Sequence, residues 1–386
     1  MGCVSSRFMF RELIRSFFFC RHNAAALELV KLATQQLPNV VNIAYFDTTF
    51  HTRTIPPHIY TYLLDPEMTL RKKIRKYGFH GISYSFILRE AAKFLQKVRF
   101  HSVPSPRPHR LTLCSHRSMR QPVEETSLIS LHLGSGASAA AIQNGQSIDT
   151  TMGLTPLEGL PGATRSGSID PSLVFHYTSD ASSLARSSTK ELHISVAEEI
   201  LNKQAGWYSI VGTTDFAKVV QGMHNRDEKM KLVFDLFVDR IVGYIGNYFV
   251  KLGGKVDSLT FSGGIGERSE DLRKVVVGKV ECLGFKLGDT LRSTNDNGAV
   301  TRLGPNVLLI KTNEEVCRKI SLRMKVSCLT DVFSSSSRWH GSVLKIVVFG
   351  NEGNTMYLWF CFLLSRFVFV FALPPRFPER ADAIEP

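Results

Sequence analysis

Apolar and polar positions follow one another along the chain in blocks that predict strands and helices in turn. Residues 24–37 (AAALELVKLATQQL) and 83–97 (SYSFILREAAKFLQK) carry apolar residues at helical spacing. Continuous apolar runs predict buried strands at Val40 to Phe46 and at Val307 to Ile310. Because strands and helices alternate, the chain is predicted to be an α/β protein whose ligands lie at the ends of its strands.

From Leu128 onwards the pattern becomes strand, turn, strand, turn. LISLHL is followed by GSGA, by SAAAI and by QNGQ, in which Asn144-Gly145 is a hairpin signal. Helices are expected at about 196–204 and 228–251. The run VDSLTFSGGIGE, residues 256–267, predicts a strand that enters a glycine turn and then a helix.

Other segments break this pattern. Residues 98–121 are basic, interrupted by proline and without periodicity, which predicts an inserted loop. Met356 to Leu373 is an apolar run of 18 residues with one arginine, barely long enough to span a bilayer. The first residues, MGCVSS, match the pattern for myristoylation of Gly2 with a palmitoylatable Cys3 beside it.

Composition narrows the classes of protein that remain. With 386 residues and 44% hydrophobic content, the chain can bury a core and is long enough for two domains. The net charge is +13, but residues 1–21, 98–121 and 323–386 carry most of the excess, so a nucleic-acid partner is not expected. The seven cysteines are scattered and never spaced as CxxC, which indicates a reducing compartment without a zinc site.

Three glycine-rich segments lie at predicted strand ends, at 134–136, 151–167 and 263–266. Turns of this kind expose backbone N–H groups that bind phosphate oxygens. Each segment taken alone is more often a hairpin or a close contact between a helix and a sheet than a phosphate site.

Charged side chains beside these turns suit phosphoryl transfer, which needs positive charge around the transferring oxygens and a metal on the nucleotide phosphates. Arg165, in GATRSGSIDP, could reach a transferring group as a planar fork. Asp47 and Glu314 each follow a strand, where a carboxylate suits Mg²⁺, although such an aspartate also commonly caps a helix. The residues alone therefore define a nucleotide-dependent transfer and nothing narrower.

Five motifs in one order resemble the acetate kinase family, the acetokinase branch of the ASKHA fold. They are FDTTFHTRTIP, YGFHGISY, HLGSGASAAAIQNGQSIDTTMGLTPLEGLPGATRSGSIDP, FSGGIGE and TNEE, and the resemblance covers about 22–97 and 122–320. It implies a duplicated ribonuclease-H-like α/β fold with ATP between the two halves. The implied reaction is reversible transfer of the ATP γ-phosphate to acetate, giving acetyl phosphate and ADP, with Mg²⁺. The family usually forms homodimers through its second domain.

The resemblance also implies roles for single residues. Catalysis is assigned to Asp47, His80, Arg165 and His22, the metal to Glu314, and the small pocket for the acceptor's methyl group to Phe79 and Pro156. The implied ATP-binding residues are His132, Leu133, Gly134, Ser135, Gly136, Asp215, Phe216, Ala217, Gly264, Ile265, Gly266, Glu267 and Arg268.

The chain departs from the family pattern at several places. The first strand with its N-A-G-S-S-S loop and the H-R-x-x-H-G-G segment are not present, so the first half-domain is expected to be incomplete. Losing two charge-assisted contacts, each worth about 1.5–3 kcal/mol, predicts a weak or inactive enzyme. Tyr84 stands where a second histidine is usual, Ser135 and Arg268 where asparagine is usual, and Ala217 where arginine is usual.

We expect five segments: an unmatched 1–21, a partial first half-domain at 22–97, an inserted basic loop at 98–121, a second half-domain at 122–322, and an unmatched tail at 323–386. The tail is expected to be disordered or to come from an imperfect gene model.

Two alternatives to an acetate kinase remain open. One is a propionate or butyrate kinase. The other is a catalytically dead, membrane-associated nucleotide-binding protein anchored at Gly2 and Cys3 or by residues 356–373. The expected location is the cytoplasm or an organellar matrix.

Overall fold

The computed structural model describes residues 41–101, 122–177, 182–186, 188, 194–288 and 298–312, with short stretches at 32, 35–36, 357–358 and 368–372. The chain divides into two compact units. The first comprises Met1–Thr49, Thr189–His193 and Arg338–Pro386, and the second comprises Phe50–Ser188 and Ile194–Ser337. Most of the helix predicted at 24–37 lies outside the described residues.

The first unit contains a small antiparallel sheet. Strand β1 (Val41–Tyr45) pairs with β9 (Val368–Ala372), which pairs with β8 (Tyr357–Leu358). The strand predicted at 40–46 is confirmed to within one residue at each end. Part of the apolar run 356–373 is therefore strand, and among the described residues no helix is long and apolar enough to cross a membrane.

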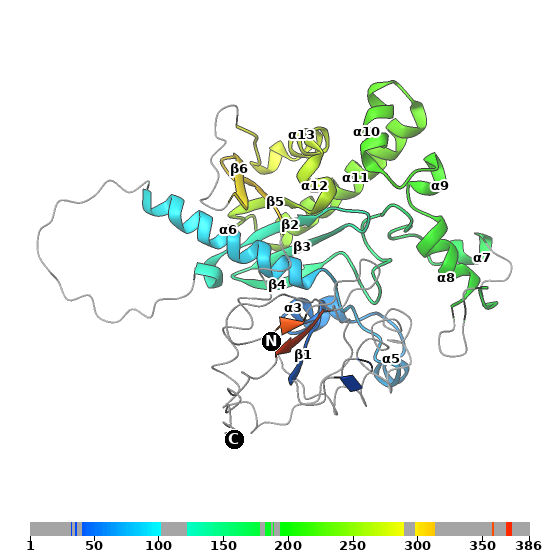
Figure 1. The fold of residues 1–386 in the computed structure, drawn as a ribbon. Helices are drawn as coiled ribbons and strands as arrows, with labels where there is room; N and C mark the ends of the chain where they lie inside the picture. The colour runs from blue at the N-terminus through cyan, green and yellow to red at the C-terminus, as the bar shows by residue number, and fades with distance from the viewer. Residues whose placement is uncertain are drawn as a thin grey trace, which may run out of the picture. The chain divides into compact units, whose positions relative to one another are not determined.

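The second unit is built on a six-stranded sheet with the order β4-β3-β2-β5-β7-β6 (Figure 1). Strands β2, β5 and β7 are parallel, whereas β3, β4 and β6 run antiparallel to their neighbours. The bounds are β2 Leu128–His132, β3 Ser138–Gln143, β4 Gln146–Thr150, β5 Ser258–Ser262, β6 Val300–Gly304 and β7 Val307–Ile310. The predicted hairpin is confirmed, because Asn144 (φ 48°) and Gly145 (φ 78°) both take the left-handed backbone of a type I′ turn.

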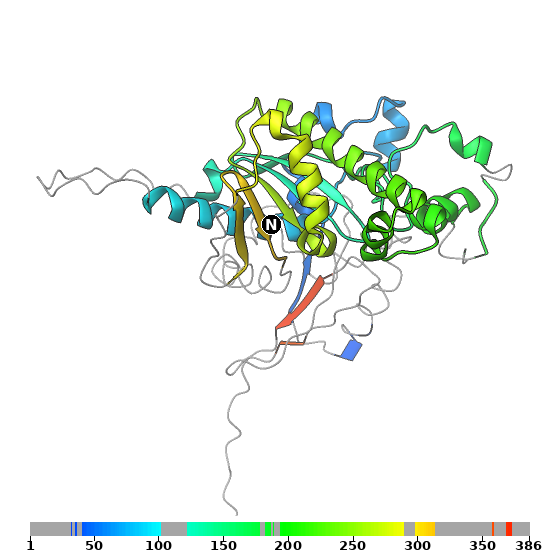
Figure 2. The same cartoon turned by 90° about the horizontal axis from the view of Figure 1, so that it is seen from above.

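Helices cover both faces of this sheet, as Figures 1 and 2 show. Helix α6 lies on one face and contacts β2, β6 and β7, while α11 and α12 contact the sheet from the other face. The longer helices are α5 Pro66–Lys72, α6 Gly81–His101, α10 Phe216–His224, α11 Glu228–Lys251, α12 Gly263–Arg268 and α13 Glu270–Lys279. The short ones are α3 Thr49–Thr52, α4 Pro57–Tyr60, η1 Pro122–Glu125, α7 Leu173–Tyr177, α8 Val196–Glu199, η2 Ile200–Gln204, α9 Tyr208–Val211 and η3 Glu281–Leu283.

Successive side chains of β2 point to opposite faces of the sheet, so they contact different layers of helices. Ile129, Leu131 and Leu133 belong to the apolar core that also contains the buried face of α11. The residues between them face the α6 side, as the ring contact of His132 with Tyr84 of α6 shows. The sheet therefore presents a dry core to α11 and a partly polar face to α6.

Helix α6 ends later than the sequence pattern predicts. The loop was expected from Val98, but the helix continues to His101. The first proline in this stretch is Pro104, so residues 98–101 contain no residue that breaks a helix.

An aromatic cluster anchors α10 and α11 in the core. The Phe237 ring lies 5.5 Å from the Trp207 ring and 5.3 Å from the Phe216 ring, both in T-shaped geometry. Phe216 also stacks on Phe234.

Replacing the central ring of this cluster tests the packing. Phe237→Ala is expected to lower the free energy of unfolding by about 3–5 kcal/mol, because it removes a side chain that is only 1% exposed and leaves a cavity. Val250→Ala on the same helix, at 76% exposure, should cost less than about 1 kcal/mol. Urea unfolding of both variants measures the difference, and equal losses would contradict the packing described.

Candidate functional site

The turn at 133–137, between β2 and β3, is tied to the neighbouring strand and helix by backbone hydrogen bonds. The Leu133 N–H donates to the Ser262 carbonyl at 2.8 Å, which extends the parallel pairing of β2 with β5 by one residue. The Leu133 carbonyl in turn accepts from the N–H groups of Ile265 (2.8 Å) and Gly266 (3.2 Å) in α12. The first glycine turn and the start of α12 therefore form one rigid assembly.

Gly263 makes this approach possible. Its φ is +78°, and a Cβ at this position would lie only 2.6 Å from the Leu133 carbonyl oxygen. Both the left-handed backbone and the missing side chain are needed here, so only glycine fits without a shift.

The loop that carries Arg165 folds onto the same turn. The Ala163 N–H donates to the Ser135 carbonyl at 2.9 Å, and the Gly162 N–H donates to the Arg165 carbonyl at 3.0 Å. The Arg165 guanidinium reaches Gly136, where an added Cβ would lie 2.9 Å from its Nη1 atom. Burial lowers the pKa of the Arg165 guanidinium. A partly desolvated cation beside a small-residue turn attracts an anionic group.

His80 comes to this turn from the α6 side of the sheet. Its ring lies 4.5 Å from the His132 ring, and its Nδ1 atom lies 2.8 Å from the Ser138 hydroxyl. The backbone of His80 is left-handed, with φ 59°, which is uncommon for a residue other than glycine. Such a conformation persists where the surrounding contacts fix the residue in place.

The backbone before His80 is held by a buried histidine that the sequence motifs did not single out as functional. His51 Nε2 donates to the Phe79 carbonyl at 3.0 Å, and His51 Nδ1 lies 2.8 Å from the Ser147 hydroxyl. The carbonyl of Gly153 also accepts from the N–H groups of Tyr77 and Gly78. Since Gly153 lies three residues before Pro156, the segments that carry the two pocket residues, Phe79 and Pro156, are bonded to each other. Both of those side chains are buried.

Glu267 connects α12 to the end of β7. Its Oε1 atom accepts from the Gly263 N–H (3.1 Å) and from the N–H and hydroxyl of Thr312 (3.0 Å each). The glycine turn that was predicted to hold the nucleotide is thus bonded to the strand end that precedes Glu314. Gly264 and Arg268 are exposed on α12, while Gly266 is buried against Leu133.

The segment 215–217 has a structural role in addition to the predicted contact with ATP. Asp215 caps α10 by accepting from the Ala217 N–H at 2.9 Å. The Phe216 side chain is buried in the aromatic cluster. A nucleotide contact at this segment would therefore fall to its exposed backbone and to Ala217.

The structure brings together most of the predicted residues, but not all of them. His80, His132, the turn 133–136, Arg165 and the start of α12 form one cluster in the second unit. Asp47 is buried in the first unit, directly after β1, so its predicted role stays a prediction. His22 and Glu314 lie outside the described residues.

The described part of the chain holds no group of three or more His, Cys, Asp or Glu side chains that could bind a metal ion. Mg²⁺ usually takes one or two carboxylates together with phosphate oxygens and water. The residues predicted for it, Asp47 and Glu314, suit this mode in their chemistry.

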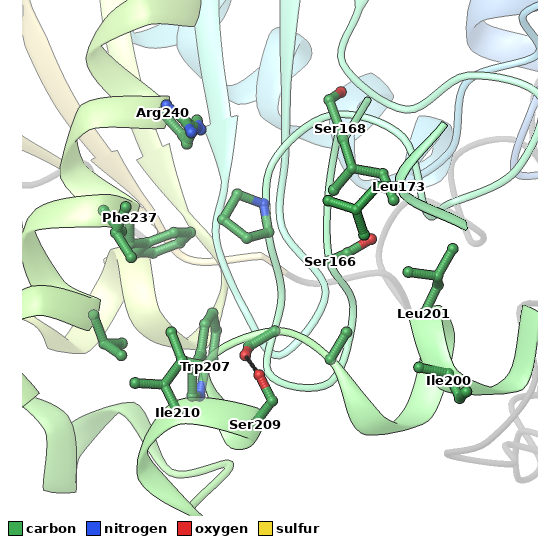
Figure 3. A pocket seen from close by; sticks show the side chains of 16 residues that line it. Ser166, Ser168, Leu173, Ile200, Leu201, Trp207, Ser209, Ile210, Phe237 and Arg240 are labelled. Atoms are coloured by element: carbon green, nitrogen blue, oxygen red, sulfur yellow. Dashed lines mark hydrogen bonds between the residues drawn. The ribbon is translucent and has the colours of Figure 1, made fainter. Parts of the chain in front are cut away.

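A cavity of about 330 Å³ is lined in part by residues that follow Arg165 in its loop (Figure 3). Ser166 and Ser168 line it from that loop, and Trp207, Phe237 and Arg240 line it from α11 and the segment before α9. Its wall is mainly apolar, unlike the turn at 133–137.

Sequence reasoning missed two side chains that act on the cluster, Ser138 and His51. A signal for Ser138 was present, because a hairpin centred on the turn at 133–137 pairs it with His132, and the structure shows this pairing. His51 stands within the motif FDTTFHTRTIP, but that motif gives no indication of its partner Ser147, which lies 96 residues away.

The part of the chain that matches known proteins contains the motifs named above. The sequence model of the acetokinase family matches residues 11–102 and 111–319. That match begins before the expected boundary at residue 22, and leaves a gap narrower than 98–121.

Two curated fungal relatives and two solved structures are similar to this chain. A probable acetate kinase of Emericella nidulans is 56% identical over 264 residues, covering 68% of this chain and 57% of the relative. One of Neurospora crassa is 50% identical over 277 residues, with 68% and 54% covered. The chain thus spans little more than half the length of these relatives.

Among solved structures, a propionate kinase from Francisella tularensis has a TM-score of 0.64 and 32% identity, covering 82% of this chain and 73% of that one. The acetate kinase of Porphyromonas gingivalis has a TM-score of 0.66 and 26% identity, covering 84% and 74%. These similarities show the ASKHA fold.

Neighbouring glycines in α12 test whether the close approach to Leu133 holds the site. Gly263→Ala is expected to lower the melting temperature by several degrees, because the new Cβ would meet the Leu133 carbonyl in a left-handed backbone. Gly264→Ala meets nothing within 4 Å and should change the melting temperature by about a degree or less. Differential scanning calorimetry compares the two, and the reverse order would refute the described contact.

Proposed function

The chain belongs to the acetokinase family, and on that premise we propose that it transfers the γ-phosphoryl group of ATP to acetate, giving acetyl phosphate and ADP. The observation that carries the proposal is the convergence of His80, His132 and Arg165 on the small-residue turn at 133–137. Cationic and N–H donors gathered around such a turn are what a transferring phosphoryl group requires.

Arg165 is proposed to stabilise the charge that spreads over the equatorial oxygens during transfer. Its guanidinium is partly buried against Gly136, so water screens it less than an exposed arginine. Its planar fork matches two phosphoryl oxygens, which a lysine cannot do. His80 is proposed to donate to the same group from its ring.

ATP is proposed to be held by backbone N–H groups of residues 134–136, since the Leu133 N–H is already bonded to Ser262, and by Gly264 and Arg268 on the exposed side of α12, with segment 215–217 at the adenosine. The hydrogen bonds of Leu133 and Glu267 support this proposal, because they join the turn after β2 to the start of α12. Glu314 is proposed as the carboxylate for Mg²⁺ and Asp47 as an acid that helps to position acceptor and metal. When bound, Mg²⁺ would neutralise charge on the nucleotide phosphates.

Acetate is favoured as the acceptor because the buried side chains of Phe79 and Pro156 belong to two segments that are hydrogen-bonded to each other, which supports a small pocket. A longer acid stays the second candidate, because the Francisella structure is named as a propionate kinase. One methylene changes the preference by only about 1–3 kcal/mol, so the pocket alone does not separate them sharply.

The N-A-G-S-S-S loop and the H-R-x-x-H-G-G segment do not occur within these 386 residues, and in this proposal they bear on the rate rather than on the type of reaction. We propose that these 386 residues, tested alone, turn over about 10²–10⁴-fold more slowly than a family member with both phosphate loops. A location in the cytoplasm or an organellar matrix goes with this function, since ATP and acetate are available there.

The reaction is tested with the full chain, ATP, Mg²⁺ and each of acetate, propionate and butyrate, by trapping the acyl phosphate as a hydroxamate. We expect kcat/KM to fall by about tenfold or more for each added methylene. Arg165→Lys should lower kcat by about 10²-fold, because one charge-stabilising fork is lost at the transferring group.

Arg226→Lys, in an exposed turn of the second unit, is the matched control and should leave kcat unchanged. Binding of ATP without acyl phosphate from any acid would favour the nucleotide-binding protein without catalysis.

A homodimer through the second half of the chain is proposed together with this function. Leu173, Ile210 and Leu236 line the 330 Å³ cavity and are still exposed at 38–40%, and Tyr208 and Leu232 are exposed nearby on α9 and α11. An exposed apolar rim of this kind favours association.

Sedimentation velocity tests the dimer. The unmodified chain should sediment as a dimer and Leu236→Asp as a monomer, because the new carboxylate would be buried in the interface. Leu287→Asp, at the same 38% exposure but away from the cavity lining, should stay a dimer. A monomeric unmodified chain would refute the proposal.

A further inference from the structure

A chain of hydrogen bonds runs from α6 through β3 to His80. The Tyr84 hydroxyl lies 2.6 Å from the Ser138 hydroxyl, which lies 2.8 Å from His80 Nδ1. Tyr84 and Ser138 are fully buried, at 0% exposure. Tyr84 comes one helical turn after His80, so the two ends of the chain belong to one helix start and its middle belongs to the sheet.

Both hydroxyls can either donate or accept, so the direction of the chain and the tautomer of His80 are linked. If Tyr84 donates to Ser138, the buried Ser138 proton is best placed in a hydrogen bond to Nδ1, because accepting from both neighbours would leave that proton directed at neither of them, and the neutral ring then carries its proton on Nε2. If the chain runs the other way, Nδ1 carries the proton and Nε2 becomes an acceptor. A phenol is a more acidic donor than an aliphatic hydroxyl, which favours the first direction.

Resting on the proposed function, we propose that Ser138 and Tyr84 are positioning residues that hold neutral His80 as the Nε2–H tautomer. In that form Nε2, the ring nitrogen that does not face Ser138, donates a hydrogen bond, which is the interaction that an anionic phosphoryl oxygen requires. The opposite tautomer would present a lone pair to that oxygen and repel it.

The proposal also accounts for a tyrosine at position 84. A histidine there would itself gain and lose a proton near neutral pH, and each change would alter what it donates to Ser138. A phenol stays neutral across that range, so the direction of the hydrogen bonds does not change with pH. Tyr84 also packs its ring against His51 and His132, at 5.5 and 6.3 Å between centroids.

The same sheet offers a matched control for a purely structural effect. Thr260 donates to the Ser130 hydroxyl at 2.9 Å, and both residues are fully buried. Ser130 lies on β2, two residues before His132, and its pair contains no histidine. Ser130→Ala thus removes a buried hydroxyl from the same sheet without touching His80.

The tautomer is measured directly by long-range ¹H–¹⁵N correlation spectra of the full chain labelled with ¹⁵N-histidine. The chain has 12 histidines, and the signal lost in His80→Gln assigns His80. In the unmodified chain and in Ser130→Ala, neutral His80 should carry its proton on Nε2 alone. Ser138→Ala and Tyr84→Phe should give a mixture of tautomers, and Ser138→Thr, which keeps a hydroxyl, should restore the single form.

Steady-state kinetics provide a second test of the positioning role. Ser138→Ala and Tyr84→Phe should lower kcat about tenfold while KM for ATP changes less than twofold, because the nucleotide contacts are untouched. Ser130→Ala should leave both constants unchanged.

The two proposals fail in different ways. If neither the unmodified chain nor any variant makes acyl phosphate, but the tautomers shift as expected, the proposed function is wrong. The role of Ser138 and Tyr84 in fixing the tautomer of His80 then stands. If the unmodified chain is active but His80 keeps the same tautomer in Ser138→Ala and Tyr84→Phe, the positioning role is refuted and the function stands. A mixed tautomer in the unmodified chain would refute the positioning role outright.

Discussion

The parallel pairing of β2 with β5 is the constraint on which the candidate site depends. Parallel strands end at the same edge of a sheet, so the turn after β2 and the helix after β5 must begin side by side. The bond from the Leu133 N–H to the Ser262 carbonyl carries the pairing one residue beyond β2, and α12 then donates two N–H groups back to Leu133. Since β7 is parallel to β5, Thr312 reaches the same edge and bonds to Glu267. The Arg165 loop joins this edge through its bond to Ser135.

Much of the second unit could be predicted from the sequence because its signals are local. The Asn144-Gly145 turn needs two left-handed residues, and few residue pairs supply them. The run from Val256 to Glu267 combined a β-type apolar block with glycines and became β5 and α12. Helix α11 agrees with its predicted bounds because its apolar spacing is long and regular. Motifs that carry the family resemblance lie at the ends of these same elements.

What could not be predicted depends on partners far apart in the sequence. The pairing of β1 with β9 joins residues separated by more than 300 positions, and no local pattern near either strand indicates it. His51 is similar, since its role follows from Ser147 and from the Phe79 carbonyl. The end of α6 was placed too early because a run of basic residues was interpreted as a loop, although the first proline comes only at residue 104.

The departures from the family pattern do not all have the same weight, and the contacts of each residue show why. Ser135 takes part in the turn through its backbone carbonyl, which accepts from Ala163, so this bond does not depend on the side chain. Ala217 donates its backbone N–H to Asp215, and a methyl group there costs the helix cap nothing. Tyr84 differs from both, because its side chain is buried and its hydroxyl is bonded to the serine that also contacts His80. A substitution where the backbone makes the contact leaves local geometry intact, whereas one at a bonded, buried side chain changes the hydrogen bonds that reach His80. Of these three substitutions, Tyr84 is therefore the one that alters the hydrogen-bonded network around His80.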